Sequence, residues 1–209
     1  MFIDLQQIIT KHNIKIKGII HVGAHKLEEY ESYKNCGINK VVWIEGNDEL
    51  IELGKQKLIE NNAQEQILLN YLVYDQDDVE LDFNITNNTE SSSILQFGKH
   101  KQYYSYIDFV KVLKKTTKTL KSIIEENKID LNFYNMLNLD LQGVELRALK
   151  GLGELIKNFN CIYTEINDDS IYIDNDYVAD IDSYLNQYGF KRAETFMLSE
   201  KWGDALYIK

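Results

Sequence analysis

The sequence predicts a doubly wound α/β fold, in which helices cover both faces of a mostly parallel sheet that ends in an antiparallel hairpin. Short apolar segments alternate along the chain with segments whose apolar residues recur every three to four positions. Strands that are apolar on both faces are typical of parallel sheets covered by helices. The last segment, 190–209, has the pattern of two strands joined as a hairpin. A length of 209 residues suits one α/β domain, so we expect residues 1–209 to form a single domain.

The first third of the chain after the N-terminal segment follows a βαβαβ pattern. Its predicted elements are strand 18–24, helix 28–37, strand 40–46, helix 47–62 and strand 66–74. The first helix ends at a glycine, and the second begins with Asn47 and Asp48, which are residue types that cap helix N-termini. Right-handed crossovers between parallel strands then place these three strands side by side in one sheet.

The remainder continues the alternation after a less regular middle. Its predicted elements are strand 77–86, loop 87–104, strand 109–120, helix 119–129, strand 133–140, helix 143–158, strand 161–167, helix 176–189 and closing strands 190–197 and 204–209. Five parallel strands and the closing pair make a seven-stranded Rossmann-like sheet.

The composition argues against nucleic-acid and membrane partners. The formal net charge is −10, so most of the surface would repel a polyanion. No apolar run approaches the roughly 18 residues that a membrane span needs, and the charged first 18 residues have no signal-peptide core. We therefore expect a cytoplasmic protein, either a monomer or a homodimer. Cys36 and Cys161 lack the spacing of a metal site, and we expect buried free thiols.

Three features at predicted strand ends point to a nucleoside: a turn of small residues after the first strand, an acid at the end of the second, and Asp140 at the end of the fourth. Ligands of doubly wound sheets bind at the carboxyl ends of the strands. Gly23 and Ala24 follow the first strand, where small residues let a ligand approach the backbone. Glu45 ends the second strand, 22 residues after Gly23, and an acid at that place commonly accepts hydrogen bonds from ribose hydroxyls.

The turn after the first strand also favours one kind of nucleoside over another. A dinucleotide motif needs further glycines there, but His25 and Glu28 occupy those positions. Glu28 would repel a pyrophosphate. S-adenosyl-L-methionine (SAM) carries no phosphate and has a sulfonium cation, so an acidic cleft suits it.

Five motifs in order strengthen this interpretation: HVGAHKLEEYESY, KVVWIEGNDEL, LNLDLQGVELRALKGL, CIYTEIN and WGDALYIK. Together they cover most of the chain and resemble the FkbM-type SAM-dependent methyltransferases. The resemblance implies a class I methyltransferase fold, SAM as the methyl donor, and O-methylation, often of sugar hydroxyls in glycans or glycosylated small molecules. The chain departs from the family at three positions: many members have Asp at His21, Gly at Leu27 and Glu at Gln142.

The strand ends and the resemblance give three sets of candidate site residues. The cofactor-binding set is His21, Gly23, Ala24, His25, Glu45, Gly46, Asn47, Asp75 and Asp140. The catalytic set is Asp140, Glu165 and His100, because a sugar hydroxyl is a poor nucleophile and needs a general base. The substrate-binding set is Ser92, Ser93, Gln142, Glu145 and Asn167.

Several alternatives remain open. Asp140 could cap the next helix, and Glu145 could be placed by the helix dipole alone. Asp140, Glu165 and Asn167 form an oxygen-rich group of the kind that binds Mg²⁺ or Ca²⁺. The chain could also be a binding module of this fold that has lost catalysis, a methyltransferase of a macromolecule, or an oxidoreductase.

Overall fold

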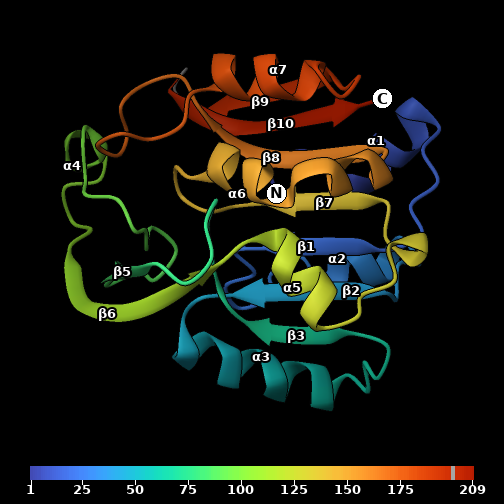
Figure 1. The fold of residues 1–209 in the computed structure, drawn as a ribbon, viewed down its shortest axis with the longest axis horizontal. Helices are drawn as coiled ribbons and strands as arrows, with labels where there is room; N and C mark the ends of the chain where they lie inside the picture. The colour runs from blue at the N-terminus through green and yellow to red at the C-terminus, as the bar shows by residue number, and fades with distance from the viewer. Residues whose placement is uncertain (199–200) are drawn as a thin grey trace.

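The computed structural model describes residues 1–198 and 201–209. Within these ranges a seven-stranded sheet forms the centre of the molecule, in the order β3-β2-β1-β7-β8-β10-β9 (Figure 1). Its strands are β1 Ile19–Val22, β2 Val41–Glu45, β3 Ile67–Asn70, β7 Met136–Leu139, β8 Cys161–Asn167, β9 Lys191–Leu198 and β10 Trp202–Ile208. The first five of these strands in sheet order are parallel, whereas β10 pairs antiparallel with both β8 and β9. The predicted doubly wound sheet with a C-terminal hairpin is confirmed.

Helices cover both faces of this sheet. The helices are α1 Leu5–His12, α2 Tyr30–Asn35, α3 Asp48–Glu60, α4 His100–Tyr103, α5 Leu120–Glu126, α6 Glu145–Leu152 and α7 Val178–Asn186, with 3-10 turns η1 Leu131–Phe133 and η2 Gly153–Asn158. Alternate residues of each strand point to opposite faces. Ile20 and Val22 therefore join the core under α5, α6 and α7. Ile19 joins a second core with α1 and α2. Among the described residues, no helix is long and apolar enough to span a bilayer.

A smaller sheet extends from the carboxyl ends of the central strands. It contains β4 Leu72–Val73, β6 Phe109–Lys118 and β5 Glu80–Thr86, in that order. We call residues 80–118 the arm. Figure 1 shows the arm at the left, on the side to which β2 and β3 point. The arm therefore stands over the edge of the sheet where a ligand is expected.

Several predicted elements differ from the structure. The predicted strand 66–74 is divided, because the chain leaves β3 after Asn70 and β4 then pairs with β6 instead. The predicted loop 87–104 contains α4, and α1 lies where no element was expected. The turn expected between the closing strands includes residues 199–200, which lie outside the described ranges, and Trp202 already belongs to β10.

Candidate active site

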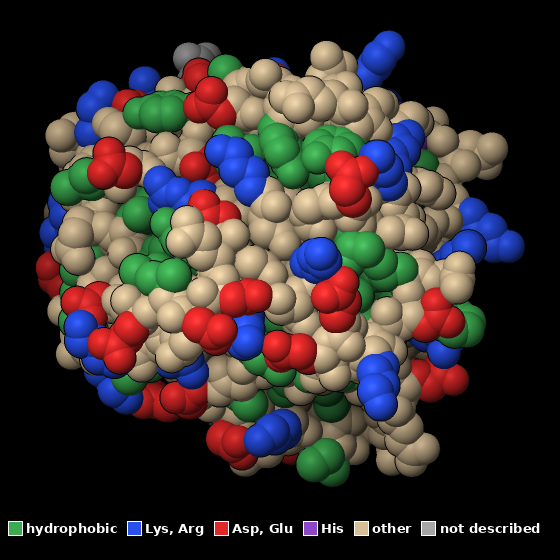
Figure 2. Space-filling view, in the orientation of Figure 1, with side chains coloured by type: hydrophobic (Ala, Val, Ile, Leu, Met, Phe, Trp, Pro, Cys, Tyr) green, Lys and Arg blue, Asp and Glu red, His purple; other side chains and the backbone are tan. Residues whose placement is uncertain are grey.

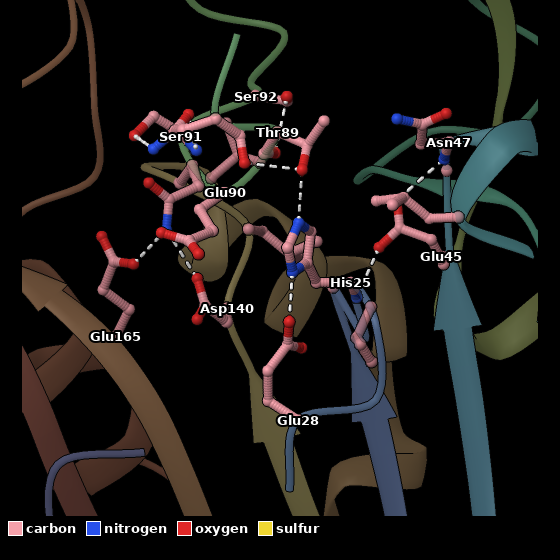
Figure 3. A pocket seen from close by; sticks show the side chains of 18 of the residues that line it. His25, Glu28, Glu45, Asn47, Thr89, Glu90, Ser91, Ser92, Asp140 and Glu165 are labelled. Carbon is pink, nitrogen blue, oxygen red and sulfur yellow. Dashed lines mark hydrogen bonds and ion pairs between the residues drawn. The ribbon is translucent and has the colours of Figure 1, made fainter. Parts of the chain in front are cut away.

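A cavity of roughly 460 Å³ opens at the carboxyl ends of the central strands. Its walls come from the turn after β1, the end of β2, the ends of β7 and β8, and residues 88–107 of the arm. Figure 3 shows side chains from these segments pointing toward one space. Cavities of a few hundred Å³ are typical of small-molecule sites. The position and the size both fit the nucleoside site that the sequence predicts.

Gly23 brings the ends of β1 and β7 into contact on the floor of the cavity. A Cβ atom at this position would lie 1.7 Å from the carbonyl oxygen of Asp140. Its φ of +78° is also a conformation that side chains disfavour. Only glycine satisfies both conditions, and the ends of β1 and β7 can therefore lie this close together beside the cavity.

Glu45 is held in place by the backbone around it. Its Oε2 accepts the N–H of His25 and its Oε1 accepts the N–H of Asn47, both at 2.8 Å. Burial raises the pKa of Glu45, while the two N–H donors act in the opposite direction. Each carboxylate oxygen can accept two hydrogen bonds, so each keeps one acceptor position for a ligand hydroxyl.

An apolar pocket adjoins Glu45. Ile44 and Leu50 line it on the side of the central sheet, and Leu72 and Phe83 line it on the side of the smaller sheet. Gly46 lies between them, since a Cβ there would be 3.2 Å from Leu72 and 3.3 Å from Phe83. A flat heterocycle attached to a ribose at Glu45 would enter this pocket.

The turn after β1 carries a polar network. The ring of His25 lies 2.6 Å from a carboxylate oxygen of Glu28 and 2.6 Å from the hydroxyl of Thr89 in the arm (Figure 3). Deeper in the cavity, Nδ1 of His21 lies 3.0 Å from the Tyr33 hydroxyl and 4.0 Å from Glu29. Burial lowers the pKa of His21, so its ring is neutral at pH 7. Carboxyl groups and polar rings thus surround the end of β1.

Gln142 joins the two candidate catalytic acids. Its side-chain amide nitrogen donates to Asp140 at 2.6 Å and to Glu165. Its amide oxygen accepts from the hydroxyl of Tyr172 at 2.8 Å, which fixes the orientation of the amide. Burial, and next the charge of Asp140, raise the pKa of Glu165 well above its usual value. The charged form is therefore disfavoured at buried Glu165, whereas Asp140 is exposed to solvent.

His100 and three aromatic residues line the side of the cavity near Glu165. The ring of His100 stacks on Phe97 with centroids 4.3 Å apart, and within the described ranges its buried Nδ1 has no hydrogen-bond partner. Burial lowers the pKa of His100 to about 4, so its ring is neutral and a weak base. Trp202 donates from Nε1 to the hydroxyl of Tyr104 at 3.0 Å, and Phe2 packs edge-on against Trp202. The aromatic wall defined by Phe2, Tyr104 and Trp202 closes this end.

Most predicted site residues meet at this cavity, and five do not line it. Those that line it are His21, Gly23, His25, Glu45, Gly46, Asn47, Ser92, His100, Asp140, Gln142 and Glu165. Those outside the lining are Ala24, Asp75, Ser93, Glu145 and Asn167. Whether a side chain at a strand end or in a turn faces the cavity depends on the local backbone geometry, and a sequence pattern does not determine this geometry.

Four of these five residues support the site from outside or belong to the surrounding core. Ala24 is buried in the core with α1 and α2. Asp75 lies against α6, where a Cβ on Gly151 would be 3.3 Å from its Cα. Ser93 donates to the backbone oxygen of Gln142 at 2.8 Å. Asn167 is fully buried in β8, away from the cavity.

Glu145 is the fifth, and it stabilises the turn that carries Gln142. Its Oε1 accepts the N–H groups of Leu141 and Gly143 at 2.8 and 3.2 Å. Its Oε2 is buried without a hydrogen-bond partner in the part of the chain that the structure describes. Burial raises the pKa of Glu145 to about 8. The predicted substrate contact is therefore replaced by a structural position under the turn.

The hypothesis of a metal ion receives no support. Asn167 does not reach the cavity, and the amide of Gln142 occupies the space between Asp140 and Glu165. In residues 1–198 and 201–209 there is no group of three or more His, Cys, Asp or Glu side chains that could hold an ion.

The sequence patterns missed other lining residues, among them Glu29, Leu72, Tyr104 and Asp204. Asp204 belongs to the WGDALYIK motif, so its place in β10 opposite Glu165 was available as a signal. Leu72 and Tyr104 follow irregular segments, where no periodicity shows which residues face the cavity.

Leu27, a departure from the family pattern, points away from the site. Its side chain is fully buried in the core and does not line the cavity. Its φ of +56° is the left-handed conformation that a glycine would adopt more easily. The departure at Leu27 therefore leaves the cavity itself unobstructed.

Comparisons with known proteins agree with this geometry. Magnesium protoporphyrin IX methyltransferase (ChlM) from Synechocystis PCC 6803 with bound SAM is similar in structure, with a TM-score of 0.52 and 12% identity over 98% of this chain and 75% of that chain. The METTL16 methyltransferase domain gives a TM-score of 0.57 and 10% identity over 98% of this chain and 64% of that chain. An uncharacterized protein from Listeria monocytogenes serotype 4b gives a TM-score of 0.53 and 7% identity over 100% of this chain and 68% of that chain. At such low identities, these structural similarities show a shared fold alone.

The family of the chain is assigned from its sequence. No curated protein sequence matches the chain. A model of the methyltransferase FkbM domain matches residues 21–192, a range that includes every residue of the three candidate sets. The class I methyltransferase fold predicted from the five motifs is confirmed by the strand order, and the chain belongs to the FkbM methyltransferase domain family.

Proposed function

We propose that the protein is a SAM-dependent O-methyltransferase that methylates a hydroxyl group of a sugar, a glycan or a glycosylated small molecule. The observation that carries the proposal is the convergence of Gly23, Glu45 and Asp140 on one cavity from the ends of β1, β2 and β7. A glycine turn, a ribose-binding acid and a polar group at the next strand suit a nucleoside donor without phosphates.

The residues present fit SAM. The free acceptor positions of Glu45 suit the ribose hydroxyls, and the pocket at Leu72 and Phe83 suits the adenine. The turn at Gly23 lines the cavity and suits the methionine portion, whose ammonium group would meet Glu29 and Asp140. Opposite charges within a few ångströms favour binding of the cationic donor in this acidic cavity.

Bound SAM supplies a methyl group that is transferred in line from its sulfur to the acceptor oxygen. The chain's own residues position the acceptor hydroxyl and remove its proton, which together lower the barrier. Asp140 is the exposed member of the pair with Glu165 and is the candidate base. Gln142 and Tyr172 hold its carboxylate in position. His100 can accept a hydrogen bond from the hydroxyl but is a weak proton acceptor.

A small acceptor is preferred to a nucleic acid. The net charge of −10 repels polyanions. On the face in Figure 2, Lys and Arg side chains are interspersed with Asp and Glu rather than gathered into one basic patch. The run of lysines on β6 is also neutralised, because Lys111, Lys114 and Lys115 pair with Glu49, Asp82 and Asp48.

Calorimetric titration of the purified protein with S-adenosylhomocysteine tests the proposal. We expect micromolar binding that does not change when Mg²⁺ is added. A titration with NAD⁺ under the same conditions is the control, and it should give no heat. Absence of S-adenosylhomocysteine binding would overturn the assignment of the cavity. Binding without transfer to any hydroxyl acceptor would instead support the degenerate binding module.

A further inference from the structure

Seven acidic residues line the cavity. They are Glu28, Glu29, Glu45, Glu90, Asp140, Glu165 and Asp204. The sequence contains 23 Lys and Arg residues, yet among the described residues none of these lines the cavity. His21 and His100 also line it, and burial lowers the pKa of both rings. His25 and Met1 line it too, but the His25 ring is paired with Glu28 and the Met1 amino group with Glu29. A phosphate or carboxylate on the acceptor would therefore find no unpaired cation among these groups.

The cofactor and the protein account for the acids near β1 and β2. Glu45 is the proposed ribose ligand. Glu28 is paired with His25, and Glu29 with the amino group of Met1 at 2.8 Å. These pairs leave the acids at the opposite end of the cavity to be explained.

At that end, buried carboxyl groups have only neutral hydrogen-bond donors. Glu165 and Asp204 are direct register partners on β8 and β10 and are 4% and 6% exposed. Glu165 accepts from the amide of Gln142, and Asp204 accepts from the hydroxyl of Tyr163 and from the N–H of Phe2. Burial raises the pKa of both groups and the charge of Asp140 adds to the rise, whereas the amino group of Met1 opposes it at Asp204. The charged forms are therefore disfavoured, and a ligand cation beside them would favour those forms.

The aromatic wall also favours a cationic ligand, and it does so independently of the acids. Trp202 and Tyr104 are joined by a hydrogen bond and line the cavity beside Glu165. Faces of Trp and Tyr rings attract cations, most strongly where water is excluded. Buried His100 also lines this end, with an Nδ1 that lacks a partner in the described ranges. The neutral ring is available to a neutral polar group of the ligand.

We propose, on the basis of the function proposed above, that the acceptor carries a basic amine beside the hydroxyl that is methylated, and no phosphate or carboxylate. Amino sugars and amino alcohols have this chemistry. The ammonium group lies between the aromatic wall and the carboxyl groups of Glu165 and Asp204. The adjacent hydroxyl then faces Asp140. A phosphate or carboxylate on the acceptor would lie beside these acids without a cation to pair with. Such an unpaired charge weakens binding and is a common source of specificity.

A matched set of ligands tests this inference on the full chain. Glucosamine, N-acetylglucosamine and glucosamine 6-phosphate, with the same three forms of galactosamine, are titrated into protein saturated with S-adenosylhomocysteine, and binding is followed by ligand-observed NMR. We expect at least one amine to bind about tenfold more tightly than its N-acetyl form, and the phosphates not to bind. Binding of S-adenosylhomocysteine in the first step tests the proposed function separately from the binding of the amino sugars.

Variants identify the carboxyl groups responsible. Asp204→Asn keeps an acceptor for Tyr163 but removes the charge, and it should reduce the preference for the amine to less than about threefold. Asp82→Asn, an exposed acid paired with Lys114 on the arm, is the control and should leave the preference unchanged. Retained S-adenosylhomocysteine binding shows that each variant is folded. Equal binding of the N-acetyl or phosphate forms, or no amine binding to the loaded protein, would overturn the inference while leaving the proposed cofactor intact.

Discussion

The α-carbon of Gly23 faces the carbonyl oxygen of Asp140 so closely that the two strand ends touch across the floor of the cavity. A Cβ on Gly23 would lie 1.7 Å from that oxygen and 2.7 Å from its carbon. Both partners are backbone, so no side-chain rotation can relieve the contact. The relative position of β1 and β7, and with it the distance between the donor-binding turn and Asp140, depends on the absence of a side chain at residue 23.

Replacing Gly23 should therefore cost far more than its φ angle alone. Gly23→Ala combines a left-handed residue with a backbone collision, and we expect a loss of at least about 3 kcal/mol in the free energy of unfolding. Urea denaturation measures this loss. Gly37→Ala is the matched control, because Gly37 has a φ of +74° and a Cβ added there would have no atom within 4 Å. It should lose only about 1 kcal/mol. Equal losses in the two variants would contradict the collision.

Glu45→Ala should weaken S-adenosylhomocysteine binding by about 10- to 100-fold, the effect of losing hydrogen bonds to a charged acceptor. Calorimetry well below the melting temperature of the variant gives the affinity. Glu49→Gln removes an exposed acid at the start of the neighbouring helix and should change the affinity less than about twofold. An unchanged affinity in Glu45→Ala would show that the ribose lies elsewhere.

Asp140→Asn should reduce methyl transfer by at least about 100-fold, because the candidate base is lost, while the melting temperature stays near that of the wild type. Release of S-adenosylhomocysteine with an accepted amino sugar is the measurement. The exposed rim acid Glu90 provides a control through Glu90→Gln, which should keep most of the activity. Transfer at the normal rate by Asp140→Asn would assign the proton to another group.

Glu145 should make the protein less stable as the pH rises. Burial raises the folded-state pKa of this carboxyl from 4.5 to about 8. Its contribution to stability is thus fully present below pH 4.5 and is lost as the pH rises through 8. Glu145→Gln removes the titration, so urea midpoints measured at pH 5 and pH 8 should differ less than in the wild type. Glu154→Gln, an exposed acid that pairs with Lys157, should retain the wild-type difference. A difference as large in Glu145→Gln as in the wild type would assign the titration to another group.

The apolar runs predicted the parallel strands because burial on both faces leaves a continuous signal. Every residue of β1, β2, β7 and β8 is buried. The division of the predicted strand 66–74 had no such signal, since it depends on whether β2 or β6 supplies the hydrogen-bond partner. Helix α1 was not predicted, although the sequence does contain a signal for it. Leu5 and Ile8 share a buried face, and Asp4 caps the first turn.

The candidate site was predictable to the extent that strand ends converge. Gly23, Glu45 and Asp140 follow from strand order alone. Tyr172 does not, because it lies between β8 and α7 in a segment that folds back to pair with the arm. There Gly98 donates to the carbonyl of Ile171 at 2.9 Å. Such contacts depend on the path of two irregular segments, and neither has a periodic pattern.

Leu27 reaches past the turn after β1 to α3, beside Gly54. A Cβ added at Gly54 would lie 3.5 Å from Leu27, which is an ordinary van der Waals distance, and 2.9 Å from Leu68 of β3, which is too close. Glycine at position 54 is therefore required by Leu68 and not by Leu27. Replacement of Gly54 by alanine would force the Leu68 side chain to move and would disturb the packing of α3 on β3, rather than the turn that carries the cofactor-binding residues.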